Sequence, residues 1–262
     1  MKHTWKAALA VAAVAMIGTA GAAKAAVTLD GQTGLFINPT AEVVKQGNGE
    51  LQGNYQHTSS FYGDSLKNYG IGGAYGVADK LELSANYAHY SAFSESANEW
   101  RVGAKYQLFN QREKGFDLAV GGNYANASGS LVDDGFNGSL KHENLYVAAT
   151  KGFGYSESRA PIKATLGLRW DHFSADGDSN SKASVYAGAE VPLSSDGQFS
   201  LIGEVGSKIA DYASTPYAIG LRYHPKNSQF SVGAGFGRPS YISQDPGAGT
   251  TLFAQVGYNF GK

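Results

Sequence analysis

The sequence predicts an all-β protein, a transmembrane antiparallel up-and-down β-barrel of about twelve strands. Between Leu81 and Phe260, apolar residues alternate with small or polar ones in runs of about ten residues, separated by turn residues. The chain also begins with the features of a secretory leader, and tyrosines recur at the predicted strand ends. Together these three observations favour a barrel that crosses a bacterial outer membrane.

The last predicted strand shows the alternation most clearly. Successive side chains of a strand point to opposite faces, so one face of this strand is apolar and the other mostly is not. One face carries Leu252, Ala254, Val256, Tyr258 and Phe260, and the other carries Phe253, Gln255, Gly257 and Asn259. A soluble antiparallel sheet would show the same alternation, with its apolar face on a core. The leader, the aromatic residues at strand ends and the rhythm of the loops decide against that alternative.

The first 25 residues have the three parts of a signal peptide. Lys2 and Lys6 supply a basic start, Ala7–Ile17 is an uninterrupted apolar run, and Ala23-Lys24-Ala25 matches a cleavage site. The apolar run is shorter than the roughly 20 residues that a membrane helix needs. We therefore expect residues 1–25 to be a leader, 26–48 a separate N-terminal segment, and 49–262 the barrel.

Composition excludes several other classes of protein. The chain has no cysteine, which excludes disulfides, thiolate metal sites and an acylated lipoprotein anchor. Its net charge is −1 and it has no basic run, so nucleic acid is not an expected partner. The 35 Gly, 16 Tyr and 13 Phe suit a barrel with one apolar face and a polar interior.

Turn residues divide the chain into the strands of the predicted barrel. The expected strands are 49–59, 67–77, 79–91, 97–108, 115–125, 143–153, 162–173, 182–192, 197–207, 214–224, 228–237 and 250–260. An even number places both termini on the periplasmic side. Long connections at 126–142, 174–181, 208–213 and 238–249 follow odd-numbered strands, whereas those after even-numbered strands are generally shorter. This asymmetry is typical of outer-membrane barrels, whose outer loops are long and periplasmic turns short.

Aromatic side chains on the predicted outer face gather at the two strand ends. The outer group is Tyr69, Tyr87, Trp100, Tyr124, Trp170, Tyr217 and Phe236, and the periplasmic group is Tyr75, Tyr106, Phe116, Phe199, Tyr223, Phe230, Tyr258 and Phe260. Amphipathic rings at two levels are what membrane–water interfaces favour. A general preference of aromatics for strands is the alternative explanation, but it does not predict two belts.

The inward face is predicted to carry equal numbers of acids and bases. The lumen-lining residues are Glu82, Asp117, Asp171, Glu190 and Glu204 together with Arg101, Lys105, Lys163, Arg169 and Arg222. Glycines between these charges leave room in the lumen. A balanced lumen argues against strong ion selectivity, and twelve strands lie between filled eight-stranded barrels and open sixteen-stranded porins. The alternative is that the charges pair across the barrel and serve only stability.

Two His-x-Ser sequences, at His89–Ser91 and His172–Ser174, are the only candidates for catalysis. Each resembles part of the H-x-S-N-G motif of outer-membrane phospholipase A, in which a His activates a lipid-facing Ser. Ala92-Phe93 and Ala175-Asp176 replace the Asn-Gly of that motif. We therefore expect no enzyme and two interfacial His residues. The sequence predicts no metal site and no cofactor, because the other His and the acids have no ligand spacing.

The segment before the barrel is the most distinctive part of the chain. It contains the pattern G-x-x-G-L-x-x-x-P-T-A, formed by Gly31, Gly34, Leu35, Pro39, Thr40 and Ala41. This pattern resembles the opening of YjbH-type outer-membrane proteins, and the resemblance implies a link to exopolysaccharide production. Either residues 26–48 enter the periplasmic mouth and partly plug it, or they form a pinned leader strand with no further role.

The sequence is compatible with three functions. The balanced, glycine-lined lumen favours a porin-like channel for small solutes or oligosaccharides. The resemblance of the N-terminal pattern favours a structural or export accessory of exopolysaccharide secretion, and the His-x-Ser pairs alone favour a lipid hydrolase. We expect an outer-membrane location, contact with outer-membrane lipid, and assembly by a machinery that recognises the final Tyr258-Asn259-Phe260.

Overall fold

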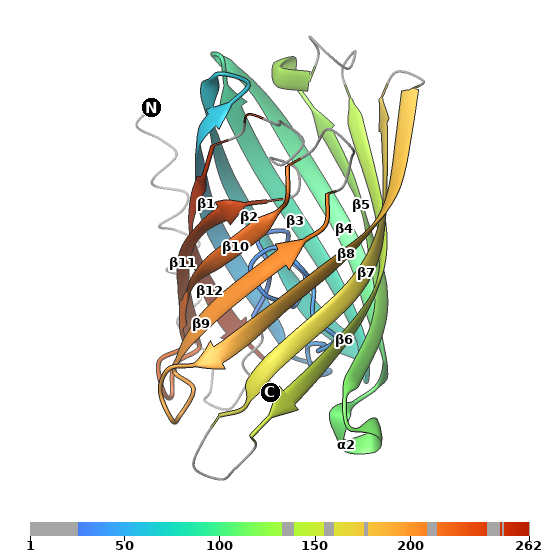
Figure 1. The fold of residues 1–262 in the computed structure, drawn as a ribbon, viewed down its shortest axis with the longest axis vertical. Coiled ribbons are helices and arrows are strands. Elements are labelled where there is room, and N and C mark those ends of the chain that lie inside the picture. The colour runs from blue at the N-terminus through green and yellow to red at the C-terminus, as the bar shows by residue number, and fades with distance from the viewer. Residues whose placement is uncertain are drawn as a thin grey trace.

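The computed structural model describes residues 26–132, 139–154, 160–175, 178–208, 214–239, 247 and 249–261. These residues form a closed barrel of twelve antiparallel strands, in which each strand pairs with its sequence neighbours and β1 pairs with β12 (Figure 1). The predicted fold class is therefore confirmed. The predicted leader, residues 1–25, lies outside the described residues.

The strand bounds follow the predicted ones closely. The strands are β1 (Gly49–Phe61), β2 (Asp64–Ala78), β3 (Leu81–Ala92), β4 (Glu95–Phe109), β5 (Asp117–Ser128), β6 (Leu140–Phe153), β7 (Ile162–Ala175), β8 (Asp178–Pro192), β9 (Phe199–Gly206), β10 (Tyr217–Tyr223), β11 (Phe230–Arg238) and β12 (Thr251–Phe260). The predicted loop at 174–181 is wrong, because β7 and β8 pair as far as Ala175 and Asp178. Its Ser, Asn and Lys residues indicated a loop, but polar residues also suit strands that extend beyond a bilayer.

Each strand has one buried and one exposed face. In β12, Thr251 and Phe253 point inward and are 0% and 4% exposed, whereas Leu252 and Val256 point outward and are 59% and 53% exposed. The barrel therefore reverses the arrangement of a soluble protein, with apolar side chains outside and polar ones inside. An outside of this kind is the surface that hydrocarbon requires.

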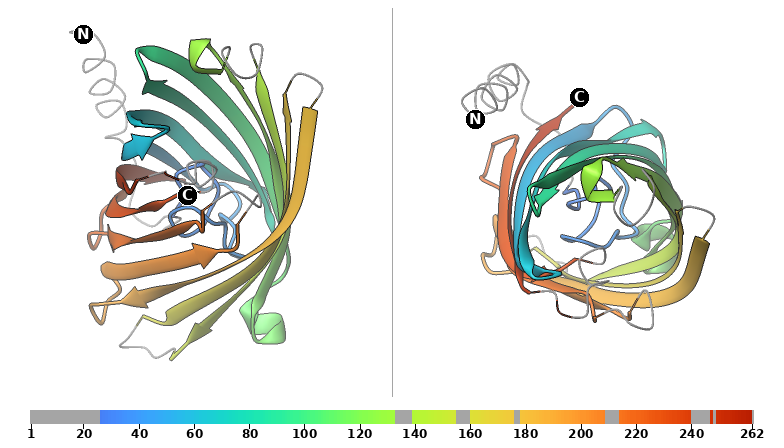
Figure 2. Two further views of the ribbon diagram at one scale, coloured as in Figure 1. Left: turned by 45° about the horizontal axis from the view of Figure 1, so that its top comes forward. Right: turned by 90° about the horizontal axis from the view of Figure 1, so that it is seen from above.

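The barrel wall is taller on one side than on the other (Figure 2). Strands β1 to β8 have 12 to 15 residues, whereas β9 to β12 have 7 to 10. About nine to eleven tilted residues suffice to cross a membrane. The longer strands thus extend beyond the apolar zone, on the side where the connections follow odd-numbered strands. We call this end of the barrel the loop end and the opposite end the turn end.

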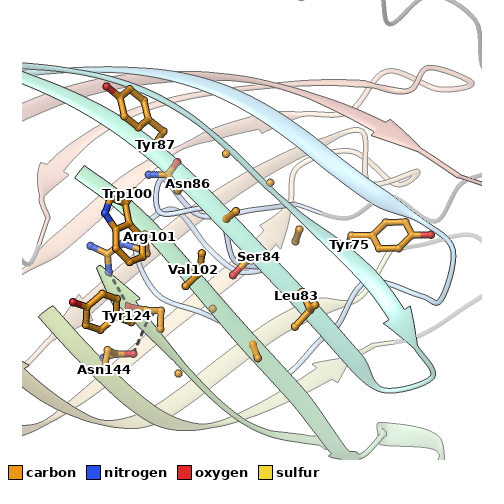
Figure 3. Close-up of a pocket in the computed structure, with 18 of the residues that line it drawn as sticks. Tyr75, Leu83, Ser84, Asn86, Tyr87, Trp100, Arg101, Val102, Tyr124 and Asn144 are labelled. Carbon is orange, nitrogen blue, oxygen red and sulfur yellow. Dashed lines mark hydrogen bonds between the residues drawn. The ribbon is translucent and has the colours of Figure 1, made fainter. Parts of the chain in front are cut away.

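Outward aromatic side chains lie where the sequence pattern placed them. Tyr87, Trp100 and Tyr124 stand together toward the loop end of an apolar groove on the outer face, and Tyr75 and Leu83 lie toward its turn end (Figure 3). The rings of Trp100 and Tyr124 are 5.2 Å apart. The arrangement matches two interfacial belts with an apolar band between them.

The turn end also carries the short helix α2 (Gln111–Lys114), between β4 and β5. Asn110 caps it by accepting hydrogen bonds from the backbone of Arg112 and Glu113, and Gly115 ends it with a left-handed backbone (φ 82°). In the described part of the chain, no helix combines the length and the apolar character needed to cross a membrane.

Candidate functional site

The barrel lumen is occupied by residues 26–48, which we call the lumen segment. Seen from above, this segment lies inside the ring of strands (Figure 2). Val27, Phe36 and Ala41 are fully buried. The segment folds back on itself through bridges between Val27 and Thr33 and between Gly34 and Pro39. It returns to the wall at the turn end and continues directly into β1.

Glu204, on the inner face of β9, is the most heavily used acceptor for the lumen segment. Its carboxylate accepts hydrogen bonds from the backbone N–H groups of Phe36, Ile37 and Asn38 at 2.8 to 2.9 Å. It also accepts one from Asn38 Nδ2 at 2.9 Å. Consecutive backbone N–H groups form a concave anion site, and here the wall itself supplies the anion. A buried charge is tolerated because donors surround it.

Glu82 and Lys105 form a second anchor on the opposite wall. Glu82 accepts hydrogen bonds from Thr33, through both its N–H and its hydroxyl, and from Val44 N–H at 3.0 Å. Lys105 Nζ lies 3.5 Å from the Glu82 carboxylate and donates to Thr33 O at 2.8 Å. Thr33 and Val44 are on the outgoing and returning limbs of the lumen segment, so this buried pair holds both limbs at once.

Arg222, on β10, holds the turn of the lumen segment from a third side. It donates to Leu35 O at 2.8 Å, and its guanidinium lies 5.1 Å from the centre of the Phe36 ring. A guanidinium over a ring face gives a cation–π contact in addition to the hydrogen bond. Tyr186 on β8 adds a hydrogen bond to Pro39 O at 2.9 Å.

Apolar contacts close the space between these polar anchors. The cluster consists of Leu29, Leu35, Phe36 and Ile37 from the lumen segment and Ile202, Ala218 and Phe253 from the wall. Glycines in the wall make room for it, because a Cβ at Gly188 would lie 2.3 Å from Leu35 Cδ1 and one at Gly220 would lie 2.9 Å from Phe36 Cε2. The room that the inner glycines leave is therefore taken by the lumen segment.

The structure gives the ten predicted lumen residues two environments. Seven are buried, namely Glu82, Arg101, Lys105, Arg169, Asp171, Glu204 and Arg222, and three are half-buried, namely Asp117, Lys163 and Glu190. Four of them pair within the wall, with Arg169 Nε 2.7 Å from Asp171 and Lys105 Nζ 3.5 Å from Glu82. Lys163 instead pairs with Glu42 of the lumen segment at 2.7 Å. Few of these charges therefore face open space.

The residues of the N-terminal pattern all lie within the lumen segment. Gly31 has a left-handed backbone (φ 91°), and a Cβ at Gly34 would lie 2.4 Å from Asn38 O. Leu35 belongs to the apolar cluster, and Ala41 N–H donates to Thr150 of the wall at 2.9 Å. Pro39 and Thr40 form the return of the turn, and both are buried. The pattern thus describes a turn that fits the wall closely.

Sequence reasoning missed the inner face of β1. Gln52 donates to Thr28 O at 2.9 Å and Asn54 to Leu29 O at 3.2 Å, so neutral amides also hold the lumen segment. Glu50 is a further inward acid, 2% exposed. The signal was present as a row of polar residues at every second position from Glu50 to Gln56. The predicted lumen residues are all charged and all lie on other strands.

The two predicted His-x-Ser pairs lie on the outer face near the loop end. His89 Nδ1 is 2.8 Å from Asn98 Oδ1, and His172 Nδ1 is 2.7 Å from Ser181 Oγ. Within the described residues, neither His has a hydrogen bond to the Ser two positions further along its own strand. The same residues contain no group of three His, Asp or Glu side chains placed to hold a metal ion.

Comparison with known proteins extends the fold assignment. The sequence matches no protein-family model and no curated protein. The structure is similar to a KdgM porin in complex with disordered oligogalacturonate, with a TM-score of 0.51, 13% identity, and coverage of 80% of this chain and 98% of that one. A second structure of the KdgM porin has a TM-score of 0.50 to this chain, with the same identity and coverage. The outer membrane protein Omp33 of Acinetobacter baumannii gives 0.46, with 9% identity and coverage of 82% and 99%. At 13% identity, the similarity to the KdgM porin shows a shared barrel fold and nothing more. The resemblance to YjbH-type proteins stays a prediction.

Proposed function

We propose that this chain is an integral outer-membrane channel for small solutes or oligosaccharides, closed in the present structure by residues 26–48. One observation carries the proposal. The lumen wall is polar and rich in glycine, and the space it encloses is filled by a separate segment rather than by side chains of the wall. An eight-stranded barrel is narrow enough for its own side chains to fill, and a barrel of twelve strands is wider. Here the wall would be left hollow if the lumen segment moved out.

The outer surface and the predicted leader support the location. An apolar band between two aromatic belts suits a bilayer, and a closed barrel leaves no backbone edge unpaired in it. The turn end would face the periplasm because its connections are the shorter ones. Outer-membrane lipid would surround the band, and the barrel-assembly machinery would act on the last strand during biogenesis.

The charge pattern of the lumen favours neutral cargo. One structural neighbour is described with oligogalacturonate, a polyanion, which supports an oligosaccharide as the class of solute. In this chain, however, the basic side chains of the lumen lie beside acids, as in the Lys105–Glu82 and Arg169–Asp171 pairs. A polyanion would meet as many carboxylates as cations there. A neutral sugar or another small polar solute meets no such repulsion.

Single-channel recording tests the proposal directly. The refolded barrel is placed in a planar bilayer with and without residues 26–48. We expect few or no conductance steps from the full barrel and discrete steps from the shortened one, because the lumen segment fills the passage. Silence from both forms, with correct folding shown by circular dichroism, would contradict the channel and leave a structural barrel.

A further inference from the structure

A cavity of about 370 Å³ lies between the lumen segment and the wall near the turn end. One side is formed by Thr40, Glu42 and Lys45 of the lumen segment, and the other by Lys163 and Glu190 of the wall. Its lining extends to the exposed turn between β8 and β9, which gives it a route to solvent at this end. Cavities that hold small ligands measure roughly 300–1,000 Å³. The volume suits one or two sugar rings and excludes a polymer.

The lining offers donors and acceptors of both charges. Glu42 and Lys163 form an ion pair at 2.7 Å, so the ammonium group is already neutralised by a carboxylate. Glu190 and Asp196 bring two further carboxylates, and Lys45 brings a second ammonium group. The buried Thr165 and Ser200 also line the cavity. Hydroxyl groups donate to carboxylates and accept from ammonium groups, so a polyol can use every partner in this set. An anion would meet the carboxylates, and a cation the ammonium groups.

Thr40 supplies a second observation that points to a ligand. Thr40 lies in the lining of the cavity and is 5% exposed. Among the described residues, its hydroxyl Oγ1 has no hydrogen-bond partner. A buried hydroxyl without a partner is costly, and most such groups in folded proteins are satisfied. A hydroxyl-bearing molecule that reached this atom from the cavity would satisfy it.

We propose that this cavity binds a neutral monosaccharide or disaccharide and that the bound sugar stabilises the closed barrel. The second half rests on the proposed channel function. Half of the lining belongs to the lumen segment, so the site exists only while the segment is docked. A ligand that binds only the docked form raises the ratio of docked to undocked protein by a factor of 1 + [L]/Kd, which is about tenfold at ten times Kd. Sugar on the turn-end side would thus oppose release of the lumen segment and opening of the channel.

The test is calorimetric titration of the full refolded chain with glucose, sucrose and glucuronate. We expect saturable binding of at least one neutral sugar and weaker binding of glucuronate. Thr40→Val keeps the shape of the side chain and removes no hydrogen bond of the docked segment, so it should preserve the fold. It should weaken sugar binding about tenfold, the effect of one hydrogen bond. Thr58→Val, the same change at a buried inward residue outside the cavity, should leave the affinity unchanged.

A second variant tests the coupling between sugar and segment. Glu204→Gln weakens the docking of the lumen segment without touching the cavity lining, so it should lower the affinity for the neutral sugar. No saturable binding of either neutral sugar, equal affinity in Thr40→Val and wild type, or tightest binding of glucuronate would each overturn the site. Unchanged affinity in a Glu204→Gln protein whose segment is shown by proteolysis to be released would overturn the coupling. Conductance of the shortened barrel without sugar binding would refute this inference alone, whereas sugar binding with a silent shortened barrel would refute only the channel.

Discussion

Replacing Glu204 by Gln should release the lumen segment from the wall. Each carboxylate oxygen of Glu204 accepts two hydrogen bonds, one oxygen from Phe36 and Ile37 and the other from the backbone and side chain of Asn38. Gln has the same shape, but one oxygen becomes an NH₂ group. Whichever way the amide lies, that group faces two donors and both of their hydrogen bonds are lost.

The size of the effect follows from the charge of the acceptor. A hydrogen bond to a charged group contributes about 1.5–3 kcal/mol, so losing two weakens docking by about 3 kcal/mol at the lower value. Since about 1.4 kcal/mol corresponds to a factor of ten, the undocked fraction should rise roughly a hundredfold. The anchors at Glu82 and Arg222 are unchanged. The barrel itself should therefore stay folded while the lumen segment moves.

Open probability in planar bilayers is the primary measurement, with protease cleavage within residues 26–48 as a second one. Glu99→Gln is the matched control, because Glu99 also lies on the inner wall but its carboxylate bonds to Arg101, at 3.0 and 3.3 Å, and not to the lumen segment. An open probability and a cleavage rate within about twofold of wild type in Glu204→Gln would refute the reasoning, since a loss of two charge-assisted bonds cannot be that small.

Three further predictions address the fit, the outer surface and the turn end. Gly188→Ala places a Cβ 2.3 Å from Leu35 Cδ1, so the lumen segment should dock less well and conductance steps should become more frequent. Val256→Lys puts a charge on the outer face at the middle of β12, and the free energy of unfolding in phospholipid vesicles should fall by about 2–4 kcal/mol. Lys80→Met removes the hydrogen bond that does most to hold the pKa of Glu113 below its usual value, so that pKa should rise in an NMR titration. A carboxylate whose pKa is lower in the folded state stabilises the fold at pH values above its unfolded-state pKa. This stabilisation is lost as the pH falls through the folded-state pKa, so the variant should lose it at a higher pH than wild type.

The first two of these predictions have a control within the chain. Gly203→Ala is the same change at a wall position where an added Cβ meets nothing within 4 Å, and it should leave the currents as they are. Ser179→Lys adds the same charge at an exposed position near the loop end of β8, where the cost should be close to zero. Each prediction is contradicted by one result. These results are equal currents for the two glycine variants, equal free energies of unfolding for the two lysine variants, and an unchanged pKa of Glu113 in Lys80→Met.

The sequence by itself determined the barrel. An alternation such as that from Leu252 to Phe260 assigns each residue to one face, because a strand has a period of two and any shift of one residue would turn apolar side chains inward. Turn residues then divide the chain into strands without knowledge of their partners. The largest difference in a strand end was four residues, at the start of β8, where residue 182 was predicted and Asp178 is observed. Polar residues there are compatible with both a loop and a protruding strand.

Only the tertiary structure decided what occupies the lumen. The pattern around Gly34 and Pro39 predicts a turn. The residues of the turn do not determine whether it lies below the mouth of the barrel or inside it. Its position depends on Glu204, which is 166 residues from Asn38 in sequence and carries no local sign of its partner. Hydrogen bonds of this kind follow from the curvature of the closed wall, which brings distant strands to face one another. For the same reason the sequence identified the charges of the lumen but not the backbone groups of the segment that they hold.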